Sequence, residues 1–205
     1  NGIRCCTWEE EEYPALLRTT ANPPAVLFYR GKLPDNEKLI AIVGSRKATA
    51  YGVQTAGRFA KGLAEEGVTI VSGGARGIDS ASHEGALEGK APTIVVAAFG
   101  LDRVYPPENR NLFHKIVEEG GAIISEYPLG TPPLGRQFPA RNRIIAGMCQ
   151  GVIVVEAAER SGSLITSDFA LEEGRDVFSV PGSIYIPSCK GTNQLIRNGA
   201  ICCTS

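Results

Sequence analysis

Residues 39–46 read Leu-Ile-Ala-Ile-Val-Gly-Ser-Arg, and residues 68–77 read Val-Thr-Ile-Val-Ser-Gly-Gly-Ala-Arg-Gly. Each stretch is a short aliphatic run that ends in glycine, which is typical of a buried β-strand followed by a tight turn. The residues between them, 51–66, carry a single apolar stripe at helical spacing, made by Val53, Ala56, Ala60 and Leu63. This strand–helix–strand order predicts a parallel sheet.

The same alternation continues along the rest of the sequence. The predicted strands are 39–44, 68–73, 92–100, 121–127, 151–156 and 176–181. The predicted helices are 51–66, 78–89, 109–119, 141–149, 164–173 and 193–199. The strands are apolar on both faces, as expected where helices cover both sides. We therefore predict an α/β fold with a mostly parallel sheet and helices on both faces.

Residues 1–38 have a different character, because prolines interrupt them and they contain only one short apolar run, 25–29. We expect this part to be an N-terminal lead-in segment that packs on the sheet edge. The α/β domain is then 39–205.

The composition limits the classes of ligand. The 205 residues are 43% hydrophobic, enough for a sizeable core, and the net charge is 21 − 22 = −1. A protein of this charge does not hold polyanions by bulk charge, so any anion site must be local. No stretch is apolar enough to cross a membrane, no signal peptide opens the chain, and the six cysteines lack metal-site spacing. We expect free thiols and a cytoplasmic protein.

Ligands of open parallel sheets bind beyond the carboxyl ends of the strands. Glycines there let the backbone approach a ligand, and the following helix offers free N–H groups and a positive dipole end. We predict a phosphate site from the two turns described above, comprising Ser45, Arg46, Gly73, Gly74, Arg76 and Gly77. The alternative is that these glycines only permit tight turns.

Residues 136–143 read Arg-Gln-Phe-Pro-Ala-Arg-Asn-Arg. Three arginines and an aromatic ring in eight residues suit backbone phosphates with a base stacked on the ring. The predicted ligand-binding residues here are Arg136, Phe138, Arg141, Asn142 and Arg143. Two alternatives stay open: Phe138 is a core residue at a helix start, or arginines of this stretch pair with Glu126 or Glu156.

Two later stretches follow the fifth and sixth predicted strands and add polar groups to the same rim. Ser161 and Ser163 either cap the next helix or contact the ligand directly. Lys190 adds a further cation, unless it is simply solvated.

Catalytic and cofactor motifs are missing from the sequence. The first turn lacks Gly-x-Gly-x-x-Gly and no phosphate-loop motif occurs, which disfavours NAD and ATP. The only histidines are His83 and His114, and no metal-binding or nucleophile motif surrounds them. We expect a binding protein without catalytic residues, cofactor or metal.

The ordered motifs of the sequence resemble those of the DNA-processing protein A (DprA/Smf) family over about residues 13–200. They are Gly44-Ser45-Arg46, Ser72 to Asp79, Tyr105-Pro106 with Asn109, Ser125-Glu126, Phe138 to Arg143, Val155-Glu156-Ala157, Ser161 to Thr166, Pro181-Gly182, and Gly191 to Ile196 with Gly199-Ala200.

The resemblance implies that 39–205 is an extended Rossmann-like domain that binds single-stranded DNA. It also implies protection of incoming single strands, help in loading RecA recombinase in natural transformation, a homodimer and no enzyme activity. The family's DNA pocket maps onto Arg46, the turn 73–77 with Arg76, and the stretch 138–143. Many members also carry an N-terminal helical domain and a C-terminal winged-helix domain, and this sequence shows neither.

Two other functions remain as alternatives. Nucleotide-processing enzymes resembling lysine-decarboxylase-like phosphoribohydrolases use Pro-Gly-Gly-x-Gly-Thr-x-x-Glu, but Leu195 stands where the catalytic glutamate should be. A small-nucleotide sensor would be saturated by a mononucleotide, whereas a DNA-binding protein needs an oligomer.

Overall fold

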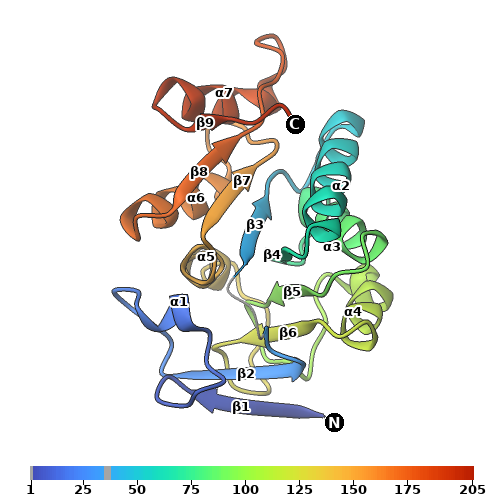
Figure 1. Ribbon diagram of the computed structural model, residues 1–205, viewed down its shortest axis with the longest axis vertical. Helices are drawn as coiled ribbons and strands as arrows, with labels where there is room; N and C mark the ends of the chain where they lie inside the picture. The colour runs from blue at the N-terminus through green and yellow to red at the C-terminus, as the bar shows by residue number, and fades with distance from the viewer. Residues whose placement is uncertain (1, 35–37) are drawn as a thin grey trace.

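The computed structural model describes residues 2–34 and 38–205, and in this part nine strands form one sheet (Figure 1). The strands are β1 (Ile3–Thr7), β2 (Val26–Gly31), β3 (Leu39–Val43), β4 (Thr69–Ser72), β5 (Thr93–Val96), β6 (Ala122–Ser125), β7 (Gly151–Val154), β8 (Asp176–Ser179) and β9 (Ile201–Cys202). Their order in the sheet is β1-β2-β6-β5-β4-β3-β7-β8-β9. All neighbours from β6 to β9 are parallel, whereas β1–β2 and β2–β6 are antiparallel.

Helices cover both faces of this sheet (Figure 1). The α-helices are α1 (Ala15–Arg18), α2 (Ala50–Glu65), α3 (Ile78–Glu88), α4 (Arg110–Glu118), α5 (Gln137–Met148), α6 (Gly162–Glu172) and α7 (Lys190–Arg197), with 3₁₀ turns η1 (Pro107–Asn109) and η2 (Pro187–Cys189). The α/β class, with a mostly parallel Rossmann-like sheet, is therefore confirmed.

Side-chain alternation along the strands divides the core between the two faces. In β3, Ala41 and Val43 face the layer of α1, α5 and α6, while Ile42 faces α2 and α3. Toward the edge of the sheet that β1 and β2 form, Val95 of β5 and Ile123 of β6 pack with α4. Both faces of the central strands are buried, which explains their unbroken apolar runs.

The strands that follow β3 in the sequence are added first on one side of β3 and then on the other. From β3 the chain proceeds through β4 and β5 to β6 on one side, and β7, β8 and β9 add on the other side. Connections after β3 and β7 therefore diverge to opposite faces and leave a crevice at the carboxyl ends of these two strands.

Several elements differ from the sequence-based prediction, and α1 and β9 are among those that were not predicted. Residues 2–34 contribute the strands β1 and β2, which extend the sheet because β2 pairs antiparallel with β6 and β1 pairs antiparallel with β2. Helix α5 begins at Gln137 instead of Arg141, because Pro139 lies in its first turn, where a backbone N–H is not needed. The division of the chain after residue 38 stays a prediction.

No helix in the described part of the chain is both long and apolar enough to cross a membrane. The six cysteines are free thiols in the structure.

Candidate nucleic-acid interface

A hollow of about 670 Å³ opens at the carboxyl ends of β3 and β7. The turn after β3, the start of α5 and the start of α6 form its walls. Its charged lining residues are Arg46, Lys47, Arg141 and Asp79, three cations against one acid. The local charge thus favours an anion, although the whole chain has a net charge of −1.

The turn after β3 presents Arg46 to this hollow. The backbone N–H of Ser45 donates to the carbonyl of Glu156 at 2.7 Å, and the carbonyl of Ser45 accepts from the N–H of Ile78 at 3.2 Å. These two bonds fix the turn between the neighbouring connections. Arg46 itself is exposed, and within the described residues the structure gives its side chain no ion-pair partner.

Two backbone N–H groups at the start of α2, those of Thr49 and Gly52, are already hydrogen-bonded within the protein. The Thr49 hydroxyl caps the helix by accepting from the N–H of Gly52 at 3.2 Å. The buried carboxylate of Glu156 accepts from the Thr49 N–H and, at 2.7 Å, from its hydroxyl. The Glu156 carboxylate therefore lies at this end of α2. The phosphate site that we expected from this turn stays a prediction.

The turn after β4 packs directly against the first turn. Gly77 has a φ of +74°, and a Cβ atom there would lie 2.3 Å from the Ser45 carbonyl oxygen. Gly74 is also left-handed, with a φ of +66°, and is buried against Phe113. Both glycines are needed for close packing and neither lines the main hollow. Gly73 and Arg76 line a small adjoining recess together with Arg46 and Phe138.

Phe138 is half-buried in the first turn of α5 and lies outside the three core clusters of the described residues. The Cζ atom of Arg46 lies 5.0 Å from the centre of its ring, and that of Arg141 lies 6.0 Å from it. The Tyr105 ring packs beside it with a centroid distance of 5.7 Å. An aromatic surface beside cations is suited to a nucleic-acid base next to its phosphate.

Arg141 lies beneath this surface and is 3% exposed. It donates to the carbonyl of Gly73 at 3.0 Å and also to the carbonyl of Val96. Burial lowers the pKa of its guanidinium to about 10, against the opposing effect of Asp79. Burial also raises the pKa of Asp79, which Arg141 partly offsets. Arg141 thus tethers the second turn while contributing positive charge to the hollow.

The remaining predicted cations do not line the hollow. Arg143 makes two hydrogen bonds to the Glu126 carboxylate, at 2.8 and 2.6 Å. The alternative that an arginine of this stretch pairs with Glu126 is therefore confirmed. Arg76 pairs with Glu108, and this pair is about half exposed. Arg136 is an exposed residue that precedes α5, and Lys190 is exposed at the start of α7.

The start of α6 forms the opposite wall. Ser161 caps this helix, and its hydroxyl lies 2.7 Å from that of Ser163. Asn142 donates to the carbonyl of Gly162 at 3.1 Å, which links α5 to this wall. The capping interpretation of Ser161 is therefore confirmed, and both hydroxyls also line the hollow.

The structure adds Lys47, Asp79 and Tyr105 to the predicted lining. Lys47 directly follows Arg46, so the pair of adjacent cations was visible in the sequence. Tyr105 belongs to a connection between strands, and only the family motif indicated it.

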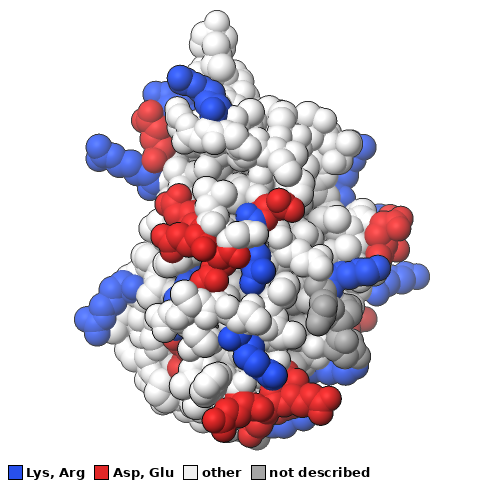
Figure 2. All heavy atoms as spheres, turned by 60° about the vertical axis from the view of Figure 1, so that its left-hand side comes forward, with Lys and Arg blue, Asp and Glu red and all other residues white. Residues whose placement is uncertain are grey.

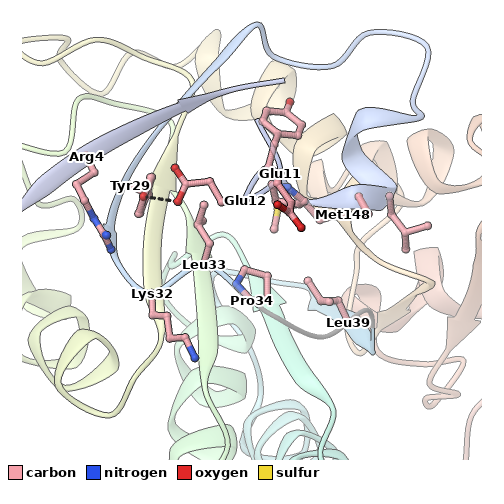
Figure 3. A pocket seen from close by; sticks show the side chains of 13 residues that line it. Arg4, Glu11, Glu12, Tyr29, Lys32, Leu33, Pro34, Leu39 and Met148 are labelled. Carbon is pink, nitrogen blue, oxygen red and sulfur yellow. Dashed lines mark hydrogen bonds between the residues drawn. The ribbon is translucent and has the colours of Figure 1, made fainter. Parts of the chain in front are cut away.

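A second hollow, of about 600 Å³, lies at the amino end of β3, away from these residues (Figure 3). Leu33, Leu39 and Met148 line it, and the Tyr29 hydroxyl donates to Glu12 at 2.9 Å. Its charged lining residues are two cations and two acids, Arg4, Lys32, Glu11 and Glu12. This hollow therefore has no surplus charge for a polyanion. Basic and acidic side chains are also interspersed over much of the face shown in Figure 2.

The comparisons with known proteins show the family of the chain. The family model described as DNA recombination-mediator protein A matches residues 4–205. The chain belongs to this family. Protein Smf of Escherichia coli (strain K12) is 46% identical over 197 residues, which cover 96% of this chain and 53% of that protein. DNA processing protein DprA of Streptococcus pneumoniae is 47% identical over 195 residues, covering 94% of this chain and 68% of that protein.

Two solved structures of the family have the same architecture. DprA from Streptococcus pneumoniae superposes with a TM-score of 0.91 at 44% identity, covering 99% of this chain and 71% of that one. DNA processing protein A from Helicobacter pylori has a TM-score of 0.87 at 31% identity, covering 97% and 89%. That second structure is described as showing a unique single-stranded DNA binding mode of the Helicobacter pylori protein. The present chain spans about half the length of the first two curated relatives, Smf of Escherichia coli and Smf of Synechocystis.

Proposed function

We propose that this domain, residues 39–205 with the preceding segment packed on its sheet, binds single-stranded DNA in the hollow at the ends of β3 and β7. The observation that carries this proposal is the approach of Arg46 to Phe138 at 5.0 Å in a hollow with surplus positive charge. Phosphates then lie near Arg46 and Lys47, and a base stacks on Phe138. The described binding mode of the Helicobacter pylori relative supports the same ligand class.

The family supports a wider role as part of the same proposal. The protein protects incoming single strands and helps load RecA recombinase in natural transformation, acting as a cytoplasmic homodimer.

We further propose that the domain is not an enzyme. Leu195, which stands where the phosphoribohydrolase motif has its glutamate, packs against the apolar core. Among the residues that the structure describes, Asp79 is the one acidic residue that lines the hollow, and it accepts a hydrogen bond from the N–H of Ala75 at 3.2 Å. A buried carboxyl group held in this way supports the turn and lacks a second acid–base group beside it.

Fluorescence-anisotropy titrations with single-stranded DNA, duplex DNA and mononucleotides test the proposal. We expect single-stranded oligomers to bind most tightly, with log affinity falling against log salt at a slope of about −2 to −3 for three to four phosphate contacts. Saturation by a mononucleotide would favour the sensor function instead. Release of free base from a nucleotide, abolished by a substitution in the hollow, would show an enzyme.

A further inference from the structure

Tyr105 lies in the connection between β5 and α4 and borders both the hollow and the adjoining recess. Its ring centre is 5.7 Å from that of Phe138, with the planes tilted by 53°. On its other side, Phe99 contacts it edge to face at 6.4 Å. Phe99 is buried in the core cluster beneath α4. The three rings therefore form a row that leads from the core to the hollow.

The outer end of this row is the part that a ligand meets. Phe138 is only half-buried, so its own helix does not fix the direction of the ring. The Tyr105 ring packs beside the Phe138 ring, and Arg46 and Arg141 lie within 6.0 Å of the Phe138 ring centre. Binding costs less when such a surface is held in place beforehand.

The same short connection also supports the turn after β4. The side-chain amide of Asn109 donates to the carbonyl of Gly74 and to the Ser80 hydroxyl, both at 2.9 Å. Glu108, one residue earlier, pairs with Arg76. Residues 105–109 thus contact both the aromatic and the cationic parts of the site.

We propose that Tyr105 is a positioning residue for base stacking, which acts by holding the Phe138 ring at the rim of the hollow. This inference rests on the proposed binding of single-stranded DNA. It assigns a role to a residue that contacts the Phe99 and Phe138 rings and also interacts through its side chain with Arg76. It predicts a larger effect on bases than on phosphates.

The test compares oligothymidylate with an abasic oligomer of equal length, which offers the same phosphates without bases. Y105L should weaken oligothymidylate binding about five- to tenfold, part of the effect of losing one stacked base, and change abasic binding less than about twofold. Y105F keeps the ring and should restore the preference for bases. Y185L is the matched control, because Tyr185 is 88% exposed on the loop before η2.

Combining Y105L with Phe138→Ala should add little to the loss caused by Phe138→Ala alone, because both act through one stacking contact. Equal weakening of both oligomers by Y105L, or full additivity with Phe138→Ala, would overturn the inference. If Y105L melts below the assay temperature, Y105M replaces it in the same comparison. Wild-type protein that binds neither oligomer would overturn the proposed function itself.

Discussion

The guanidinium carbon of Arg46 lies 5.0 Å from the centre of the Phe138 ring. Arg46 follows β3, whereas Phe138 stands in the first turn of α5, so the sheet and its helical layer bring the two together. A cation in this position is attracted by the ring face. In the proposed binding mode, an incoming strand offers Arg46 a phosphate and Phe138 a base, so two contacts with DNA replace one contact within the protein.

Arg46→Ala tests the phosphate contact. We expect a similar loss of affinity for every DNA sequence, because phosphate contacts position a strand without reading its bases. The slope of log affinity against log salt should become shallower by about 0.7. Arg58→Ala removes an exposed guanidinium from α2 and serves as the control. A loss confined to particular sequences would show that Arg46 contacts bases.

Phe138→Ala separates stacking from core packing. If the ring stacks on a base, DNA binding weakens by about 1–3 kcal/mol and the free energy of unfolding changes little. If the ring is a core residue, the same change costs about 3–5 kcal/mol of stability. Thermal melting and a DNA titration of this variant distinguish the two, and a large fall in melting temperature with intact binding would refute stacking.

Arg141→Met tests the tether beneath the hollow. Methionine retains part of the side-chain volume but leaves the carbonyls of Gly73 and Val96 without their donor. We expect the free energy of unfolding, measured in urea, to fall by about 1–3 kcal/mol. An unchanged unfolding free energy together with lost DNA binding would instead identify Arg141 as a direct phosphate ligand.

Glu108→Gln should increase DNA affinity. Glu108 forms an ion pair with the Arg76 guanidinium, which lines the recess. The hydrogen bond between them also raises the pKa of Arg76. Without the carboxylate, Arg76 is available to one more phosphate, and the salt slope should steepen by about 0.7. Glu84→Gln makes the same change of charge at an exposed site on α3 and controls for the overall field. Equal gains in the two variants would exclude a specific role for Glu108.

His83 should make stability depend on pH. The Thr93 hydroxyl donates to the carbonyl of Ile70, so Nδ1 of His83 donates to Thr93 at 2.7 Å and the buried ring is neutral. Burial lowers the pKa of His83 from 6.5 to about 3. Between these values only the unfolded chain binds the proton, so stability falls as pH drops below 6.5, by up to about 2 kcal/mol at pH 5. His83→Asn should remove this part of the pH dependence in urea unfolding. An identical pH profile in the variant would contradict the assignment.

The central layers of the fold were predictable because their signal is local. The aliphatic runs of β3 and β4 are buried on both faces, and each carries its own pattern. The strands β1 and β2 were not predicted, because their pairing depends on the exposed edge of β6 and not on an alternation within residues 2–34. The early start of α5 was hidden by Pro139, which ends helices in their interior but is tolerated in a first turn.

Much of the chemistry of the site can be read from the sequence, because the glycine turns and the stretch 136–143 contain Arg46, Phe138 and Arg141. Which of the predicted groups line the hollow depends on the folded structure. Arg76 and Arg143 are paired with Glu108 and Glu126, and Arg141 is buried, while Arg46 remains exposed beside Phe138. Ion pairing and burial depend on distances between segments far apart in the chain, and those distances exist only after the sheet has assembled.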